Sequence, residues 1–283
     1  MLNNYKLDIK VINNLNKIRL RLLFLPFLLL FVIAIFLFLK NAFSVEGYIE
    51  IQENLFFYLN GKLAEFPNLQ FNLTQLGDAL VFFSLLAVFI VYTPKLWGAI
   101  LTSGLISLVF SASLKKLFSV PRPAAIFDNE SFVIVGKTLT GHTSLPSGHS
   151  ITTLTVITLL LFAFMPKLLK SKIVWSLFVI IIGLIIALSR VGVGAHFPLD
   201  VLIGSIIGYI SAILGIIINN KVSWWNWIQN KKYYPVFILL LTICFAVITK
   251  KVLENNLLVF YFSLLSLVVT LFLMIKIYAK KEY

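Results

Sequence analysis

Residues 22–39 read LLFLPFLLLFVIAIFLFL, an uncharged apolar run between Arg21 and Lys40. The hydrocarbon core of a bilayer is about 30 Å thick, and a helix needs about 17–25 apolar residues to cross it. This run therefore predicts a transmembrane helix. The apolar part of a cleaved signal peptide is shorter, about 7–15 residues, so we interpret the run as a retained membrane anchor.

Apolar runs of similar character recur along the whole chain. The composition is 60% hydrophobic and only 12% charged, whereas soluble domains carry about 25% charged residues. Lipid offers no partner for backbone N–H and C=O groups, so such runs must be helices, because strands would alternate apolar and polar residues. We predict an all-α integral membrane protein, a bundle of six core transmembrane helices with about two additional C-terminal spans. The further runs, of which the first is the shortest, are 79–94, 96–114, 150–166, 173–189, 201–220, 233–249 and 255–275.

The organisation along the chain predicts one polytopic membrane domain over residues 1–283. Within it we expect a catalytic core at about 95–220, an extracytoplasmic connection at 41–75, and the additional C-terminal spans in 221–283. Part of the connection, residues 46–60, is amphipathic. That pattern fits either an interfacial helix on the outer leaflet or a structured loop.

The formal net charge of +13 indicates membrane sidedness. Lysine and arginine accumulate in cytoplasmic loops, and with the N-terminus inside, most basic residues of this chain fall in inner segments. We therefore expect membrane lipids and not nucleic acid as partners, in a bacterial-type inner membrane. The same orientation places the loop from Lys115 to Gly148 on the outer face. The single cysteine, Cys244, lies within a span, so no disulfide framework is expected.

Histidines and basic residues gather in the two outer loops. All three histidines, His142, His149 and His196, fall there, and so do Lys115, Arg122 and Arg190. Ionisable groups near membrane depth are costly, so a cluster of them indicates a function. Three cations that converge on one point predict an anion site, because arginine holds phosphate oxygens through two parallel hydrogen bonds.

The sequence Pro146-Ser147-Gly148-His149 directly precedes an apolar run and gives the anion a second binding device. The N-terminus of a helix presents free backbone N–H groups and the positive end of the helix dipole, which suit phosphate. Gly148 permits close approach of the backbone, and the Ser147 hydroxyl can donate a hydrogen bond.

Histidine can supply the chemistry that a phosphate ester needs. His196 and Asp200 are one helical turn apart, so Asp200 can fix the imidazole tautomer while the other ring nitrogen attacks phosphorus. His149 is the candidate general acid for the leaving group. His142 is expected to be a solvated loop residue, with a headgroup contact as the alternative. The outer loop holds only Asp128 and Glu130 as carboxylates, too few for a metal pair, so we expect neither metal nor cofactor.

These residues resemble the type 2 phosphatidic acid phosphatase superfamily, also called lipid phosphate phosphatases. The resemblance covers about residues 95–220 and includes all three family motifs. It implies that His196 forms a phosphohistidine assisted by Asp200, and that His149 is the acid. It also implies that phosphate is bound by Lys115, Arg122, Ser147, Gly148 and Arg190. The matching positions are Lys115, Arg122 and Pro123 in the first motif, Pro146, Ser147, Gly148 and His149 in the second, and Ser189, Arg190, His196 and Asp200 in the third.

The expected function is therefore a metal-independent phosphatase acting on a membrane lipid phosphate or pyrophosphate at the extracytoplasmic face. Candidate substrates are undecaprenyl pyrophosphate, phosphatidylglycerol phosphate, phosphatidic acid and lipid A. Two alternatives stay open. A lipid phosphotransferase would use the same phosphohistidine but pass the phosphoryl group to an acceptor other than water. A non-catalytic lipid-phosphate transporter would only bind, although transporters place their polar groups within the spans and not at the span ends.

Overall fold

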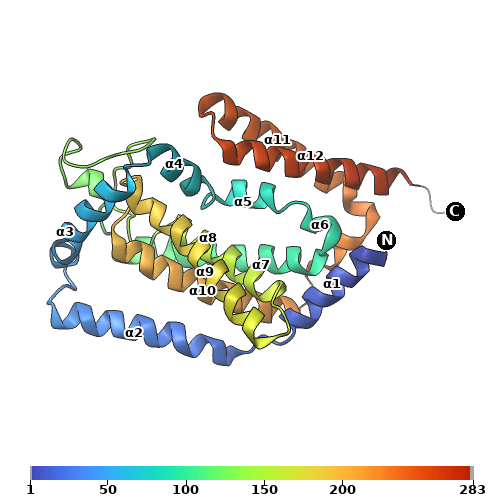
Figure 1. Cartoon of the computed structure of the whole chain (residues 1–283), viewed down its shortest axis with the longest axis horizontal. Coiled ribbons are helices and arrows are strands. Elements are labelled where there is room, and N and C mark those ends of the chain that lie inside the picture. The colour runs from blue at the N-terminus through green and yellow to red at the C-terminus, as the bar shows by residue number, and fades with distance from the viewer. Residues whose placement is uncertain (1, 223, 281–283) are drawn as a thin grey trace.

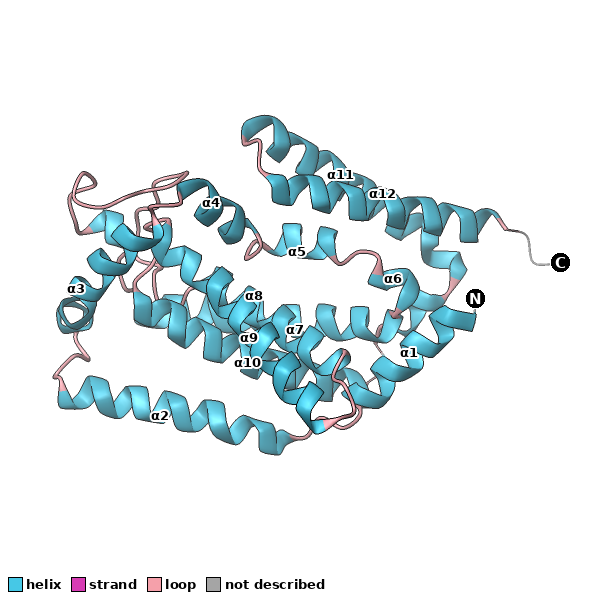
Figure 2. Cartoon of the chain, in the orientation of Figure 1, coloured by secondary structure: helices cyan, strands magenta, loops and turns pink. Residues whose placement is uncertain are grey.

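The computed structural model describes residues 2–222 and 224–280, and all regular structure within them is helical (Figures 1 and 2). This confirms the predicted fold class. Helices α7 to α10 lie side by side in the middle of the molecule, with α2 along one side and the pair α11–α12 along the other (Figure 1). The α-helices are α1 (Leu2–Leu15), α2 (Phe24–Leu39), α3 (Val45–Leu63), α4 (Pro67–Gln75), α5 (Ala79–Leu85), α6 (Phe89–Tyr92), α7 (Pro94–Phe118), α8 (Gly148–Ala163), α9 (Leu169–Gly192), α10 (Pro198–Lys221), α11 (Tyr234–Glu254) and α12 (Leu258–Ala279).

By length and composition, six segments of the described chain can cross a membrane. They contain α2, α7, α9, α10, α11 and α12. Helix α8 is also apolar but has only 16 residues, and most of its side chains are buried among its neighbours. A helix rises about 1.5 Å per residue, so α8 is shorter than the hydrocarbon core. It is the buried centre of the bundle and not a helix surrounded by lipid.

Close packing of α10 on α8 sets the geometry of the core. Gly204 and Gly208 on α10 have no room for a Cβ atom, because it would overlap with the carbonyl oxygens of Ser147 and Ile151. Small residues spaced in this way let two membrane helices approach closely. The contact continues to the helix ends, where the Ser147 amide donates to the Asp200 carbonyl at 3.0 Å. The second and third motifs are thereby fixed to each other.

The span predicted over 79–94 does not form one helix. Helix α5 ends at Leu85, and α6 begins at Phe89 after a turn. A broken helix leaves carbonyl groups that lipid cannot satisfy, so it is tolerated only where protein surrounds it. Here the Ser266 hydroxyl of α12 donates to the Leu85 carbonyl at 2.8 Å. Figure 1 shows α5 and α6 between the core and the C-terminal pair.

The amphipathic segment in the connection is helix α3, which settles the choice between a helix and a loop. Ser44 caps its N-terminus by accepting a hydrogen bond from the Gly47 amide at 3.0 Å. Its buried face repeats every fourth residue as Tyr48, Gln52, Phe56 and Asn60. Most of these side chains are polar, so the face that packs on the protein is not the purely apolar one that membrane-surface helices present.

Candidate active site

The ends of the four core helices bring the predicted residues together. Burial lowers the pKa of His196 well below its usual value, and the nearby Arg122, Arg190 and Lys115 charges and His149 lower it further. These four side chains lie at the same end of the helix bundle, and Arg122 Nη1 is 3.4 Å from His196 Nε2. They come from the C-terminal end of α7 and the loop after it, the first turn of α8 and the last turn of α9.

His196 lies in the turn before α10 and is 1% exposed. Its Nδ1 is 3.5 Å from Asp200 Oδ2, and its Nε2 is 3.4 Å from Arg122 Nη1. The Ser144 hydroxyl lies beside both groups, 3.4 Å from His196 Nδ1, and donates to Asp200 Oδ2 at 2.5 Å. The carboxylate therefore borders one ring nitrogen while the other faces a guanidinium. This arrangement separates an orienting side of the imidazole from a reacting side.

Three donors hold the Asp200 carboxylate, which is fully buried. Besides Ser144, the Tyr48 hydroxyl donates to Oδ1 at 2.8 Å and the Phe197 amide donates to Oδ2 at 3.0 Å. Burial raises the pKa of Tyr48 well above its usual value, and the Asp200 charge raises it further, so the phenol stays protonated and remains a donor. A carboxylate with this many donors has a fixed orientation.

Sequence reasoning missed Tyr48 and Ser144. Ser144 stands two residues before Pro146 in the motif-bearing loop, and that proximity is the only sequence signal that could have suggested it. Tyr48 lies far from every motif in the sequence. It belongs to the segment 46–60, whose amphipathic character is recognised from its apolar residues alone. Its role is visible only when α3 is packed against the core.

The basic residues differ in how far their hydrogen bonds are satisfied. Arg190 is 5% exposed, and its Nη1 donates to Thr74 Oγ1 at 2.6 Å, but its buried Nε finds no acceptor among the described residues. Arg122 donates from Nη1 to the Ala195 carbonyl at 3.2 Å. A buried N–H of a charged group without an acceptor is costly. An anion bound between these cations would supply the missing acceptor.

The second motif supplies the first turn of α8. A Cβ atom on Gly148 would lie 3.2 Å from Ser111 Oγ and 3.4 Å from Lys115 Nζ, so glycine lets the lysine approach the helix N-terminus. Ser147 is fully buried, and its hydroxyl accepts hydrogen bonds from the Ser150 amide at 3.4 Å and the Ser150 hydroxyl at 2.9 Å. Ser147 is thus the N-cap of α8, and a phosphate contact from it stays a prediction.

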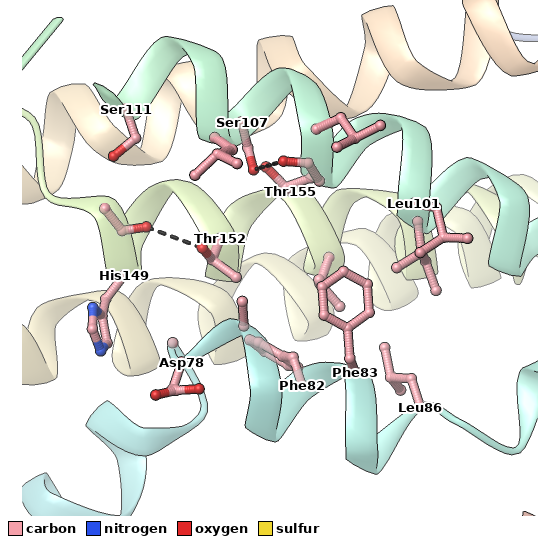
Figure 3. Close-up of a pocket in the computed structure, with 18 of the residues that line it drawn as sticks. Asp78, Phe82, Phe83, Leu86, Leu101, Ser107, Ser111, His149, Thr152 and Thr155 are labelled. Carbon is pink, nitrogen blue, oxygen red and sulfur yellow. Dashed lines mark hydrogen bonds between the residues drawn. The ribbon is translucent and has the colours of Figure 1, made fainter. Parts of the chain in front are cut away.

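His149 lies at the end of a cavity of about 590 Å³. Figure 3 shows the His149 ring at one end of this cavity, with Phe82 and Phe83 of α5 and the following Leu86 along one wall. Leucines of α7 and the Thr152 face of α8 form the other side. The lining is mostly apolar, so the cavity joins the His149 ring to a space that suits a hydrocarbon chain.

The remaining predicted residues lie away from this cluster. His142 is exposed in the loop before α8, as expected for a solvated residue. Asp128 and Glu130 are exposed as well, and Asp128 Oδ1 accepts a hydrogen bond from the Glu130 amide at 3.2 Å. Over residues 2–222 and 224–280, no three His, Cys, Asp or Glu side chains come together in a group that could hold a metal ion. Metal independence itself stays a prediction.

Comparison with protein families matches residues 95–224 to the PAP2 superfamily. Comparison with curated protein sequences finds no relative. Among solved structures, the crystal structure of Aquifex aeolicus LpxE is similar, with 26% sequence identity and a TM-score of 0.49. That match covers 59% of this chain and 95% of the other.

Proposed function

This chain belongs to the PAP2 superfamily, and on that premise we propose that it removes phosphate from a membrane lipid through a phosphohistidine on His196. The observation that carries the proposal is the buried imidazole of His196, whose Nε2 is 3.4 Å from Arg122 Nη1, together with a buried Arg190 whose Nε finds no acceptor in the described part of the chain. A phosphate group has the charge and the acceptor oxygens to complete this arrangement.

The first step forms the phosphoenzyme. His196 carries its proton on Nδ1, beside Asp200, so Nε2 holds a lone pair. Nε2 attacks phosphorus and forms the N–P bond while the P–O bond to the lipid breaks, and His149 passes a proton to the departing oxygen. Burial, followed by the nearby cations, lowers the pKa of His149 well below its usual value. His149 therefore takes this proton from the monoanionic phosphate ester as it binds, and the negative charge of the phosphate offsets the cations. Lys115, Arg122 and Arg190 hold the phosphoryl oxygens and stabilise the charge that develops on them.

The second step restores the enzyme. His149, now neutral, takes a proton from a water molecule as that water attacks phosphorus. The N–P bond breaks, inorganic phosphate leaves, and His196 and His149 return to their starting protonation states. The depressed pKa of His196, caused first by burial, favours the neutral ring that this cycle needs as a nucleophile.

The substrate class follows from the cavity beside His149. An apolar space of about 590 Å³ next to the cations suits a molecule with a phosphate head and a hydrocarbon tail. Undecaprenyl pyrophosphate, phosphatidylglycerol phosphate, phosphatidic acid and lipid A all have this form. We place the catalytic core at about 95–220, within one membrane domain that also includes 41–75 and 221–283.

We propose that the site faces the periplasm or the cell exterior of a bacterial inner membrane. Helix α10 runs from Asp200 at the site to Lys221 at its other end, where Arg19 and Arg21 line the same pocket. Basic residues favour the cytoplasmic side. The orientation therefore puts the catalytic end outside.

Two measurements on purified protein in detergent test the proposal. With EDTA present, we expect phosphate release from at least one of the four candidate lipids. After rapid acid-free quenching with labelled substrate, we expect label on the protein that is stable in alkali and lost in acid, as a phosphoramidate is. Activity that disappears with EDTA and returns with a divalent metal would contradict the mechanism.

A further inference from the structure

The C-terminal helix pair reaches the edge of the site through one ion pair. Lys251 of α11 places its Nζ 2.8 Å from Asp78 Oδ2, and the two side chains are 26% and 28% exposed. The other carboxylate oxygen of Asp78 caps α5 by accepting from the Leu80 amide at 2.9 Å and the Val81 amide at 3.3 Å. Asp78 therefore joins the start of α5 to a helix that lies outside the family-matched region 95–224.

The turn that contains Asp78 packs directly against the side chain of His149. A Cβ atom on Gly77 would lie 2.8 Å from His149 Cβ and 3.1 Å from His149 Cδ2, so the backbone of this turn is in direct contact with the histidine side chain. Asp78 and His149 lie at the same end of the cavity (Figure 3). A shift of the turn would therefore change the room available to the His149 ring.

Helix α5 has few means of holding its own position. It has only seven residues, and helices shorter than about 12 residues are marginal without tertiary contacts. The cavity separates much of it from α7 and α8, while it packs against α11 and α12. The Ser266 hydroxyl of α12 also satisfies the Leu85 carbonyl at the end of α5. The C-terminal pair is therefore the support for both ends of this short helix.

We propose that Asp78 and Lys251 are positioning residues that hold the turn at Gly77 against His149, so that the C-terminal helix pair sets the placement of the acid. This inference rests on the proposed function, in which His149 protonates the leaving group. Loss of either partner would leave an unpaired, partly buried charge and free the turn. Neither residue is among those that we assign to phosphate binding, so binding and the nucleophile should be little affected.

The leaving group of the substrate distinguishes this role from a general loss of fold. An alkyl phosphate needs a proton on its departing oxygen, whereas 4-nitrophenolate leaves without one. The variants are Asp78→Asn, which keeps a good N-cap residue but removes the charge, Lys251→Met, and the double variant, which leaves no unpaired charge. For each we expect kcat/KM for an alkyl phosphate to fall about tenfold, with less than about a twofold change for 4-nitrophenyl phosphate.

The matched control is Lys250→Met. Lys250 is the neighbouring lysine on α11, and its ion pair with Glu254 is mostly exposed, so both substrates should react as with wild type. The double variant should lose no more than the single variants, because all three remove one interaction. Equal losses on both substrates, or none on either, would overturn the inference. A wild-type protein that hydrolyses neither substrate would instead overturn the proposed function.

Discussion

The core helices α7 to α10 and the helices around them contribute different things to the site. The core carries the motif residues, which form the proposed phosphate site. We use the term shell for α3, α4, α5, α11 and α12. The shell supplies hydrogen-bond partners to the motif residues. Tyr48 donates to Asp200, and Thr74 accepts from Arg190. The groups that would touch the substrate and the groups that hold them in place thus come from separate parts of the chain.

The physical reason for this division is the cost of burying polar groups. A charged side chain at the centre of a helix bundle needs hydrogen-bond partners, and any that the ligand does not supply must come from neighbouring helices. Changes in the core should therefore remove chemistry, whereas changes in the shell should weaken placement or stability.

Replacement of His196 by alanine should abolish the reaction. Because the proposed mechanism forms the N–P bond on His196, kcat/KM for phosphate release should fall by about 10⁴-fold or more. The matched control is His142→Ala, which removes an exposed loop histidine and should leave the rate unchanged. Both are measured as phosphate release from the best lipid of the candidate panel. A His196→Ala enzyme that keeps substantial activity would place the nucleophile elsewhere.

Asn60 of the shell should matter mainly for stability. Its Nδ2 donates to the carbonyls of Val133 and Val191 at 3.0 Å each, and its Oδ1 accepts from the Val133 amide at 2.8 Å. Asn60→Ala leaves these buried groups without partners and should lower the free energy of unfolding by about 2–3 kcal/mol. The protein that remains folded should keep kcat/KM within the same order of magnitude.

The measurement for Asn60→Ala is thermal unfolding in detergent, followed together with the specific activity of the folded fraction. Asn68→Ala, an exposed position on α4, is the control and should leave the melting temperature near that of wild type. If Asn60→Ala abolished the reaction without altering stability, the division between core and shell would fail at this position.

The core residues could be predicted from sequence because ionisable side chains cluster at the ends of a few apolar runs. Lys115, His149, Arg190 and His196 lie at the ends of apolar runs, where ionisable residues are conspicuous. Two membrane crossings between the second and third motifs also require both to lie on the same face. The structure brings these side chains together at one end of the bundle, and the roles assigned to them stay predictions.

The shell could not be predicted in the same way. Tyr48, Gln52 and Asn60 look like the solvent-facing side of an amphipathic helix, yet they bond to Asp200 and to backbone groups at the end of α9 and the start of α10. The break at residues 86–88 contains neither proline nor glycine, so local sequence gives no warning of it. Its stabilising partner, Ser266, is distant in the chain. Such contacts depend on packing, which hydropathy and motifs do not encode.

A single shell hydroxyl should have a smaller effect than either change above. Tyr48→Phe keeps the ring but removes the donor to Asp200 Oδ1, and a hydrogen bond to a charged group contributes about 1.5–3 kcal/mol. At the lower end of that range, kcat/KM falls about tenfold. Tyr58→Phe changes an exposed tyrosine on the same helix and should have no effect. Full activity in Tyr48→Phe would mean that Ser144 and Phe197 suffice to orient Asp200.

The smallest predicted effect is a dependence of stability on pH that belongs to the core. Burial, followed by the nearby cations, lowers the pKa of His196 well below 6.5 in the folded protein, whereas the unfolded chain has a pKa near the ordinary value of about 6.5. Below that pH the unfolded state binds a proton that the folded state does not. Folding free energy is therefore lost as the pH falls below 6.5, and above it this histidine contributes no slope.

The slope for one such group reaches at most about 1.4 kcal/mol per pH unit, so between pH 6.5 and 5.5 the loss should be about 1 kcal/mol or less. In detergent, the melting temperature of wild type should fall over this interval more than that of His196→Gln, which has no titrating ring. Tyr48→Phe, a shell variant that keeps His196 buried, should retain the wild-type slope. Equal slopes in wild type and His196→Gln would show that folding does not lower the pKa of His196.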